Sequence, residues 1–149
     1  MKKFKNVLCA VDFSKYCRNA AERAAEIARF YGARLTLLHV VEHFGVNRSN
    51  VLISPEDIDP RYYHEQQAKK SLAELARSLD YDKVEQEVRF STQAAKRAIV
   101  RYAGEKNTDL IVVATHGRHG ITSILGSTSY GVTHMARCDV LVISAHHKN

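Results

Sequence analysis

Two polar segments each follow a short apolar run of the sequence. One run ends in Ala10-Val-Asp-Phe-Ser14 and a later run ends in Ala114-Thr-His-Gly117. The carboxylate of Asp12 can accept hydrogen bonds from a ribose or from a base. The first segment therefore offers an acceptor for a sugar or base, while a simple helix-capping role for Asp12 stays open as an alternative.

The later segment leads to Leu125-Gly-Ser-Thr128, at an expected helix start. A glycine-containing loop that enters a helix can direct backbone N–H groups, and the positive end of the helix dipole, at a phosphate. Glycine suits such a loop because it lets the backbone approach a ligand closely. The alternative is that Gly117, Gly120 and Gly126 are turn residues only.

Other kinds of site have weaker support. His116 and His119 lie three residues apart and His146-His147 come near the end of the chain, but no carboxylate or cysteine accompanies them in a metal-ligand pattern. We therefore predict no native metal site, and we expect His39, inside an apolar run, to be a hydrogen-bonded core residue. The sequence holds neither the G-x-S-x-G turn of serine hydrolases nor a P-loop.

Composition and charge indicate a cytoplasmic protein. The N-terminal sequence has no signal-peptide pattern, and no apolar stretch approaches the roughly 20 residues that cross a bilayer. Cys9, Cys17 and Cys138 form no C-x-x-C pair, which favours a reducing compartment and buried or half-buried thiols. The net charge of +6 admits nucleic acid, but the basic residues alternate with acidic ones along expected helices, so we predict no nucleic-acid binding.

Short apolar runs predict the strands. Near-continuous runs of β-branched and aliphatic residues are typical of strands that are buried on both faces, and they occupy residues 7–11, 35–41, 110–114 and 140–143. The segment from Lys83 to Phe90 instead alternates apolar and charged side chains, which predicts an edge strand.

Apolar side chains at helical spacing predict helices around residues 20–28, 68–79 and 94–102. The expected helix starts are Ser14 for the first, Asp59 followed by Pro60 for the second, and Ser91 or Thr92 for the third; the expected ends are Gly32 for the first and Gly104 for the third.

Strands that alternate with helices predict a doubly wound α/β fold, with a mainly parallel sheet covered by helices on both faces. The length of 149 residues suits a single domain over residues 1–149. In such sheets ligands bind outside the carboxyl ends of the strands, at the point where the strand order reverses. Both polar segments are expected at that edge.

Over essentially its whole length the chain resembles the universal stress protein family. The resemblance rests on Val11-Asp-Phe-Ser14, on Leu37-Leu-His-Val-Val41, and on the block from Asp109 through Leu125-Gly-Ser127 to Ile143. It implies a five-stranded parallel sheet of order 3-2-1-4-5 and a homodimer. One branch of the family binds ATP through G-x2-G-x9-G-[ST].

Carried onto this chain, the first glycine of that pattern falls on Ala114, the second on Gly117, and the last Gly-Ser on Gly126-Ser127. Eight residues separate Gly117 from Gly126, so the match between Gly117 and Gly120 is out of register. The resemblance implies ATP or AMP as ligand, with Mg²⁺ as an optional companion. It places Asp12 against the ribose or adenine, Val40 or Val41 beside the base, and phosphates near Gly117, Arg118, Gly126, Ser127 and Thr128. The full set of expected binding residues is Ala10, Val11, Asp12, Val40, Val41, Ala114, Thr115, His116, Gly117, Arg118, Gly126, Ser127 and Thr128.

Three functions stay open at this stage. The first is a stress-response module that binds an adenine nucleotide and signals to an unknown protein partner through its nucleotide state, without being a committed enzyme. The second, favoured by Ala114 and the short loop, is a dimeric interaction protein that binds no nucleotide. The third is an enzyme such as a nucleotide hydrolase, since slow ATP hydrolysis is compatible with the residues.

Two further expectations concern surfaces. The run from Val140 to Ile143 carries no charge and no proline, so its free edge is expected to pair antiparallel with a second copy of the chain. The segment from Glu42 to Asp59 has no apolar period and is expected to be a mobile flap near the nucleotide.

Overall fold

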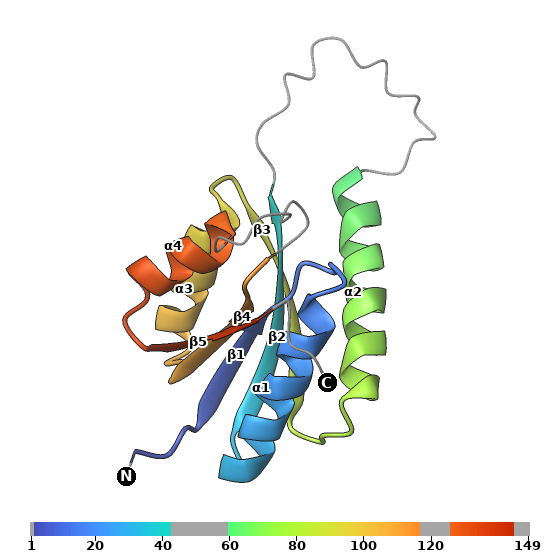
Figure 1. Cartoon of the computed structure of the whole chain (residues 1–149). Helices are drawn as coiled ribbons and strands as arrows, with labels where there is room; N and C mark the ends of the chain where they lie inside the picture. Colours follow the sequence, from blue (N-terminus) through green and yellow to red (C-terminus); the bar gives the residue numbers. More distant parts are fainter. Residues whose placement is uncertain (1, 43–59, 117–125, 145–149) are drawn as a thin grey trace, which may run out of the picture.

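The computed structural model describes residues 2–42, 60–116 and 126–144. Its centre is a five-stranded parallel sheet of order β3-β2-β1-β4-β5 (Figure 1). The predicted fold class and strand order are confirmed. The strands are β1 (Asn6–Ala10), β2 (Arg34–Glu42), β3 (Val84–Ser91), β4 (Leu110–Ala114) and β5 (Asp139–Ile143).

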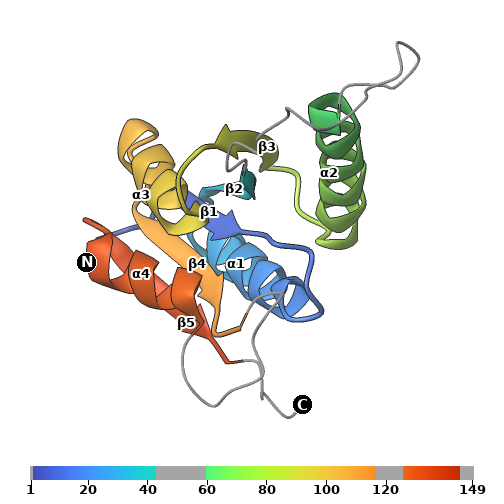
Figure 2. The same cartoon turned by 90° about the horizontal axis from the view of Figure 1, so that it is seen from above.

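Helices cover both faces of this sheet. Figure 2 shows α1 (Cys17–Tyr31) and α2 (Pro60–Ser78) on one side, and α3 (Ala95–Glu105) and α4 (Ser127–Met135) on the other. In the part of the chain that the structure describes, no helix is long and apolar enough to cross a membrane.

Successive residues of β1 belong to two different cores. Val7 and Cys9 pack with the buried alanines of α1, whereas Leu8 packs with Ile99 of α3 and Val132 of α4. This explains the near-continuous apolar character of the run, because both faces of the strand are covered. Small side chains on the buried stripe of α1 let that helix lie close to β1; they are Ala20, Ala21, Ala24, Ala25 and Ala28.

The predicted helix ends are correct in part. Gly32 ends α1 with a left-handed backbone (φ 67°), as predicted, and α2 begins at Pro60. The prediction that Gly104 ends the third helix was wrong, because α3 continues through Glu105. Its capping residue is Lys106, whose N–H donates to the carbonyl of Tyr102. Asp59 lies outside the described residues.

The predicted caps at Ser14 and at Ser91 or Thr92 were also wrong. The capping residue of α1 is Tyr16, and that of α3 is Ala94; neither makes a side-chain cap. The Oγ of Ser91 accepts a hydrogen bond from the N–H of Gln93 instead, within the turn that precedes α3. A short polar side chain can serve a turn as readily as a helix start.

Charged side chains along β3 fit its position at the edge of the sheet. Glu85 pairs with Arg34 of β2 (3.3 Å), and Glu87 pairs with Arg89 (3.0 Å). The prediction that residues 83–90 form an edge strand is confirmed.

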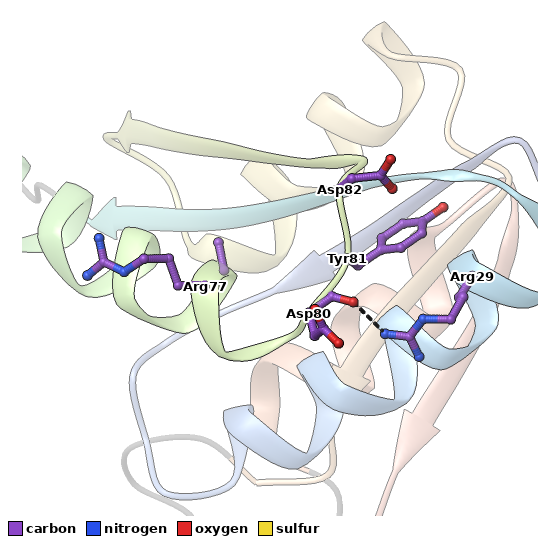
Figure 3. A pocket seen from close by; sticks show the side chains of 6 residues that line it. Arg29, Arg77, Asp80, Tyr81 and Asp82 are labelled. Atoms are coloured by element: carbon purple, nitrogen blue, oxygen red, sulfur yellow. Dashed lines mark hydrogen bonds between the residues drawn. The ribbon is translucent and has the colours of Figure 1, made fainter.

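At the amino end of the sheet, the loop between α2 and β3 is anchored to α1. Nη2 of Arg29 donates to the carbonyls of Leu79 (3.1 Å) and Asp80 (3.0 Å). The hydroxyl of Tyr81 lies 2.6 Å from the carbonyl oxygen of Ala33 and 3.2 Å from that of Ala28. Beside these contacts lies an open cleft of about 600 Å³, which Figure 3 shows, lined by Arg29, Ala76, Arg77, Asp80, Tyr81 and Asp82.

We expect Tyr81→Phe to lower the free energy of unfolding by about 1–2 kcal/mol, because the hydroxyl bridges two helix-end carbonyls and its loss leaves the Ala33 carbonyl short of a partner. Urea unfolding followed by circular dichroism measures this. Tyr63→Phe is the matched control, since Tyr63 is 54% exposed. Equal stabilities for the two variants would contradict the anchoring role of Tyr81.

Candidate functional site

The strand order reverses at β1, which is the feature that locates the candidate site. β1 pairs with β2 on one side and with β4 on the other, and all three strands run parallel. The helices that follow β1 and β4 leave toward opposite faces of the sheet (Figure 2). A doubly wound sheet binds its ligands at the carboxyl end of such a pair.

The loop after β1 holds Asp12 in a tight turn. The N–H of Ser14 donates to Oδ1 of Asp12 (3.0 Å), a contact between a side chain and the backbone two residues on. Phe13 between them has a left-handed backbone (φ 60°), which is uncommon for a residue other than glycine. Its aromatic ring lies 4.5 Å from the ring of His39.

This loop is also tied to β2. The N–H of Val11 donates to the carbonyl of Leu38 (2.8 Å), and Nδ1 of His39 lies 2.7 Å from the carbonyl oxygen of Val11. Because a carbonyl only accepts, Nδ1 of His39 carries the proton in this contact. The expectation that His39 is a hydrogen-bonded residue is confirmed, although its side chain is half-buried rather than fully buried.

Thr115, directly after β4, connects three elements. Its N–H donates to the carbonyl of Ile143 at the end of β5 (2.9 Å), and its carbonyl accepts from the N–H of Gly126 (2.7 Å). Oγ of Ser129, the third residue of α4, lies within hydrogen-bonding distance of two carbonyl oxygens, those of Thr115 (3.1 Å) and Gly126 (3.0 Å). The start of α4 is therefore held at the carboxyl end of β4.

His116 brings the two loops into contact. Its side chain is 5% exposed, and its ring lies 6.0 Å from the ring of Tyr16, which precedes α1. Nδ1 of His116 is 3.0 Å from Oγ1 of Thr115. The loop that carries Asp12 and the segment that leads toward α4 therefore lie side by side.

The first turn of α4 presents backbone donors without a competing acid. Gly126 caps the helix in an extended conformation (φ −60°, ψ 157°), and no acidic residue stands in the first turn. Ser127 is exposed and Thr128 is half-buried. Such a helix start suits an anion, because its first N–H groups have no partner within the helix.

The comparisons agree with this architecture. The model of the universal stress protein family matches residues 3–144. The chain belongs to the universal stress protein family. Universal stress protein A homolog 1 of Coxiella burnetii is 35% identical over 141 residues, which is 94% of this chain and 96% of that protein.

Solved structures show the same fold. Universal stress protein UspA from Lactobacillus plantarum has a TM-score of 0.73 and 25% identity, and the match covers 96% of this chain and 99% of that one. The universal stress protein from Archaeoglobus fulgidus in complex with dAMP has a TM-score of 0.67 at 20% identity, covering 95% and 99% of the two chains.

Most of the expected binding residues of this universal stress protein lie at one edge of the sheet. Ala10 ends β1, Ala114 ends β4, and Val40 and Val41 are half-buried near the end of β2. Gly117 and Arg118 lie outside the described residues, as do residues 43–59 of the expected flap and the histidines at 119, 146 and 147. Within the described ranges, no three His, Cys, Asp or Glu side chains come together as a metal site.

One buried hydroxyl at this edge fits a polar ligand. Oγ of Ser14 is shielded from solvent and has no hydrogen-bond partner in the described part of the chain. A buried hydroxyl without a partner costs about 1–3 kcal/mol, so a water or a polar ligand that hydrogen-bonds to Ser14 would recover this free energy. The sequence predicted only helix capping for Ser14, although its place two residues after Asp12 puts it in the same loop as that carboxylate.

The thiols of the two buried cysteines near this loop have pKa values above the ordinary value for cysteine. Burial raises the pKa of Cys9, and the neighbouring Cys17 and Asp12 raise it further. Burial likewise raises the pKa of Cys17, with the charge of Asp12 as a second cause. Both thiols stay protonated and serve as small core residues, as the sequence predicted.

Proposed function

We propose that this universal stress protein binds an adenine nucleotide, ATP or AMP, at the carboxyl ends of β1 and β4. The bound nucleotide alters the surface that a partner protein recognises, and the protein acts as a homodimeric stress-response module rather than as a committed enzyme. The contact between Tyr16 and His116 carries the proposal, because it brings the carboxylate loop of Asp12 beside the helix start at Gly126.

Each end of a nucleotide has chemically suitable partners at this edge. The carboxylate of Asp12 accepts hydrogen bonds from ribose hydroxyls or from the adenine amino group, and the Oγ of Ser14 can supply one more. Val40 and Val41 offer an apolar wall for the base. The first N–H groups of α4 face no acidic side chain in the first turn, which suits phosphate.

The relative with dAMP supports a nucleoside phosphate as the ligand class. In the proposal, Gly126, Ser127 and Thr128 hold phosphates, together with Gly117 and Arg118. If ATP binds together with Mg²⁺, the side-chain oxygens of Asp12 and Ser127 would be the candidate protein ligands. We assign no catalytic residue.

A second function is favoured by one residue. Ala114 is half-buried at the end of β4, where the nucleotide-binding pattern has glycine. Its methyl group stands where the backbone would otherwise be bare, and this favours a dimeric interaction protein that binds no nucleotide. Identifying whether a nucleotide is bound to the purified protein distinguishes the two functions.

The proposed dimer uses the free edge of β5. Among the described strands β5 pairs only with β4, so its other edge has backbone groups available for a second copy. Residues Val140 to Ile143 are half-buried, and Asp139 is the charged residue at the start of the strand. Antiparallel pairing of two identical β5 strands would give the free backbone N–H and C=O groups of both copies hydrogen-bond partners, through one self-complementary surface.

Asp12→Ala is expected to weaken ATP and AMP binding by roughly 10–100-fold, the usual loss for hydrogen bonds to a charged group. Gly126→Val should also weaken binding, because a branched side chain crowds the first N–H groups of α4. Isothermal titration calorimetry measures both affinities. Asp82→Ala is the control, since Asp82 is an exposed carboxylate at the amino end of the sheet; an equal loss in this control, or no nucleotide binding by the wild type, would refute the proposed site.

Val142→Lys should convert the dimer into a monomer, because it places a charge in the centre of the pairing strand, at a position that also packs against the core under α3 and α4. Sedimentation velocity gives the mass, and circular dichroism verifies the fold. Glu85→Lys on the opposite edge strand is the matched control and should leave the mass unchanged. A wild-type protein that sediments as a monomer at tens of micromolar would exclude this dimer.

A further inference from the structure

The first turn of α3 lies at the same edge of the sheet as the proposed nucleotide site. Oε1 of Glu42, the last residue of β2, accepts a hydrogen bond from the N–H of Ala95, the first residue of α3 (3.3 Å). This contact fixes the start of α3 to the carboxyl end of β2. Lys96 follows directly in the chain.

The side chain of Lys96 lies against α4. A Cβ added to Gly131 would overlap Cδ of Lys96, and it would lie 3.1 Å from Cβ and 3.2 Å from Cγ of that lysine. Gly131 therefore provides the space in which the lysine stem lies, in the second turn of α4. Figure 2 shows the two helices side by side on this face of the sheet.

The charge of Lys96 has no counterion among the described residues. Ion pairs elsewhere on the surface neutralise other basic side chains, such as Arg101 by Glu105 on the same helix, but none involves Lys96. The neighbouring first turn of α4 contains no acidic residue and carries the positive end of the helix dipole. Gly131 lies one turn after this helix start, so an anion bound at the start of α4 would lie near the Lys96 stem and be attracted by the lysine charge and by the helix dipole.

We propose that Lys96 binds the outer phosphates of the nucleotide and makes the site prefer ATP over AMP. The inference rests on the proposed function and deepens it, since it selects the ligand by phosphate number. A lysine ammonium acts as a point charge on phosphate oxygens. AMP has a single phosphate, which the backbone N–H groups of α4 can hold without the lysine.

The competing explanation is that the lysine stem only fills the contact between α3 and α4. Lys96→Met separates the two explanations, because methionine keeps an unbranched apolar stem and removes the charge. Arg97→Met is the matched control: it removes the same charge from the next, exposed position of the same helix.

Calorimetric titration of the full chain with ATP and with AMP tests the proposal. Lys96→Met should weaken ATP binding by roughly tenfold or more and AMP binding by less than about threefold, in line with the loss of one charge-assisted hydrogen bond. Arg97→Met should leave both affinities unchanged. Equal ATP affinities for the two variants, or equal losses of ATP and AMP in Lys96→Met, would overturn the proposal.

Gly131→Ala provides a second, independent variant. This variant keeps the charge of Lys96 but displaces the lysine stem from α4, so the ratio of ATP affinity to AMP affinity should fall. Thermal unfolding verifies that the variant is folded. An unchanged preference in this folded variant would also count against Lys96. If the wild-type protein binds neither ATP nor AMP, the proposed function itself is refuted. If the wild type binds nucleotide and Lys96→Met binds ATP and AMP with unchanged affinities, only the proposed role of Lys96 is refuted.

Discussion

The geometry of the carboxyl edge depends on the backbone of Thr115. Its N–H holds the end of β5, and its carbonyl accepts from both the N–H of Gly126 and the hydroxyl of Ser129. These contacts place the start of α4 directly beyond β4, although the chain between them is long. Without these hydrogen bonds, the first N–H groups of α4 would have no defined position relative to Asp12. The proposed nucleotide site needs both: the carboxylate of Asp12 as acceptor and the N–H groups of α4 as donors.

The two ends of the sheet differ in how far their polar groups are satisfied. At the amino end, Arg29 and Tyr81 saturate the carbonyls where α1 and α2 end, and Gly32 closes α1 in a left-handed conformation. At the carboxyl end, Ser14 keeps a buried hydroxyl without a partner, and Lys96 keeps a charge without a counterion among the described residues. The carboxyl end therefore keeps two polar groups that a ligand could satisfy.

The strands could be predicted from the sequence because they follow from local pattern, and their order then brings the residues of the candidate site to one edge of the sheet. Apolar runs covered on two faces identified β1 and β4, and the charged alternation identified β3 as an edge. The helix ends could not be predicted equally well. Ser14 and Ser91 are sensible capping residues by type, but both belong to turns that precede the helices, with Tyr16 and Ala94 at the actual starts.

The contacts that build the candidate site join residues far apart in the chain, so no local pattern reveals them. Tyr16 meets His116 only because β1 and β4 are neighbours, and Lys96 lies on α4 only because residue 131 is glycine. The resemblance to the family predicted the strand order, which is confirmed, and suggested the proposed ligand class, but it carried no information on Lys96 or on the hydroxyl of Ser14. Those features come from the packing of this chain.

Binding of an adenine nucleotide at this edge of the sheet can be tested by identifying the small molecule that purifies with the wild-type protein. Acid release followed by liquid chromatography and mass spectrometry identifies the molecule and gives its amount per chain. We expect an adenine nucleotide, with more than one phosphate if Lys96 selects ATP as proposed. A folded protein that releases no nucleotide, and takes up none from millimolar ATP or AMP, would refute nucleotide binding at this edge.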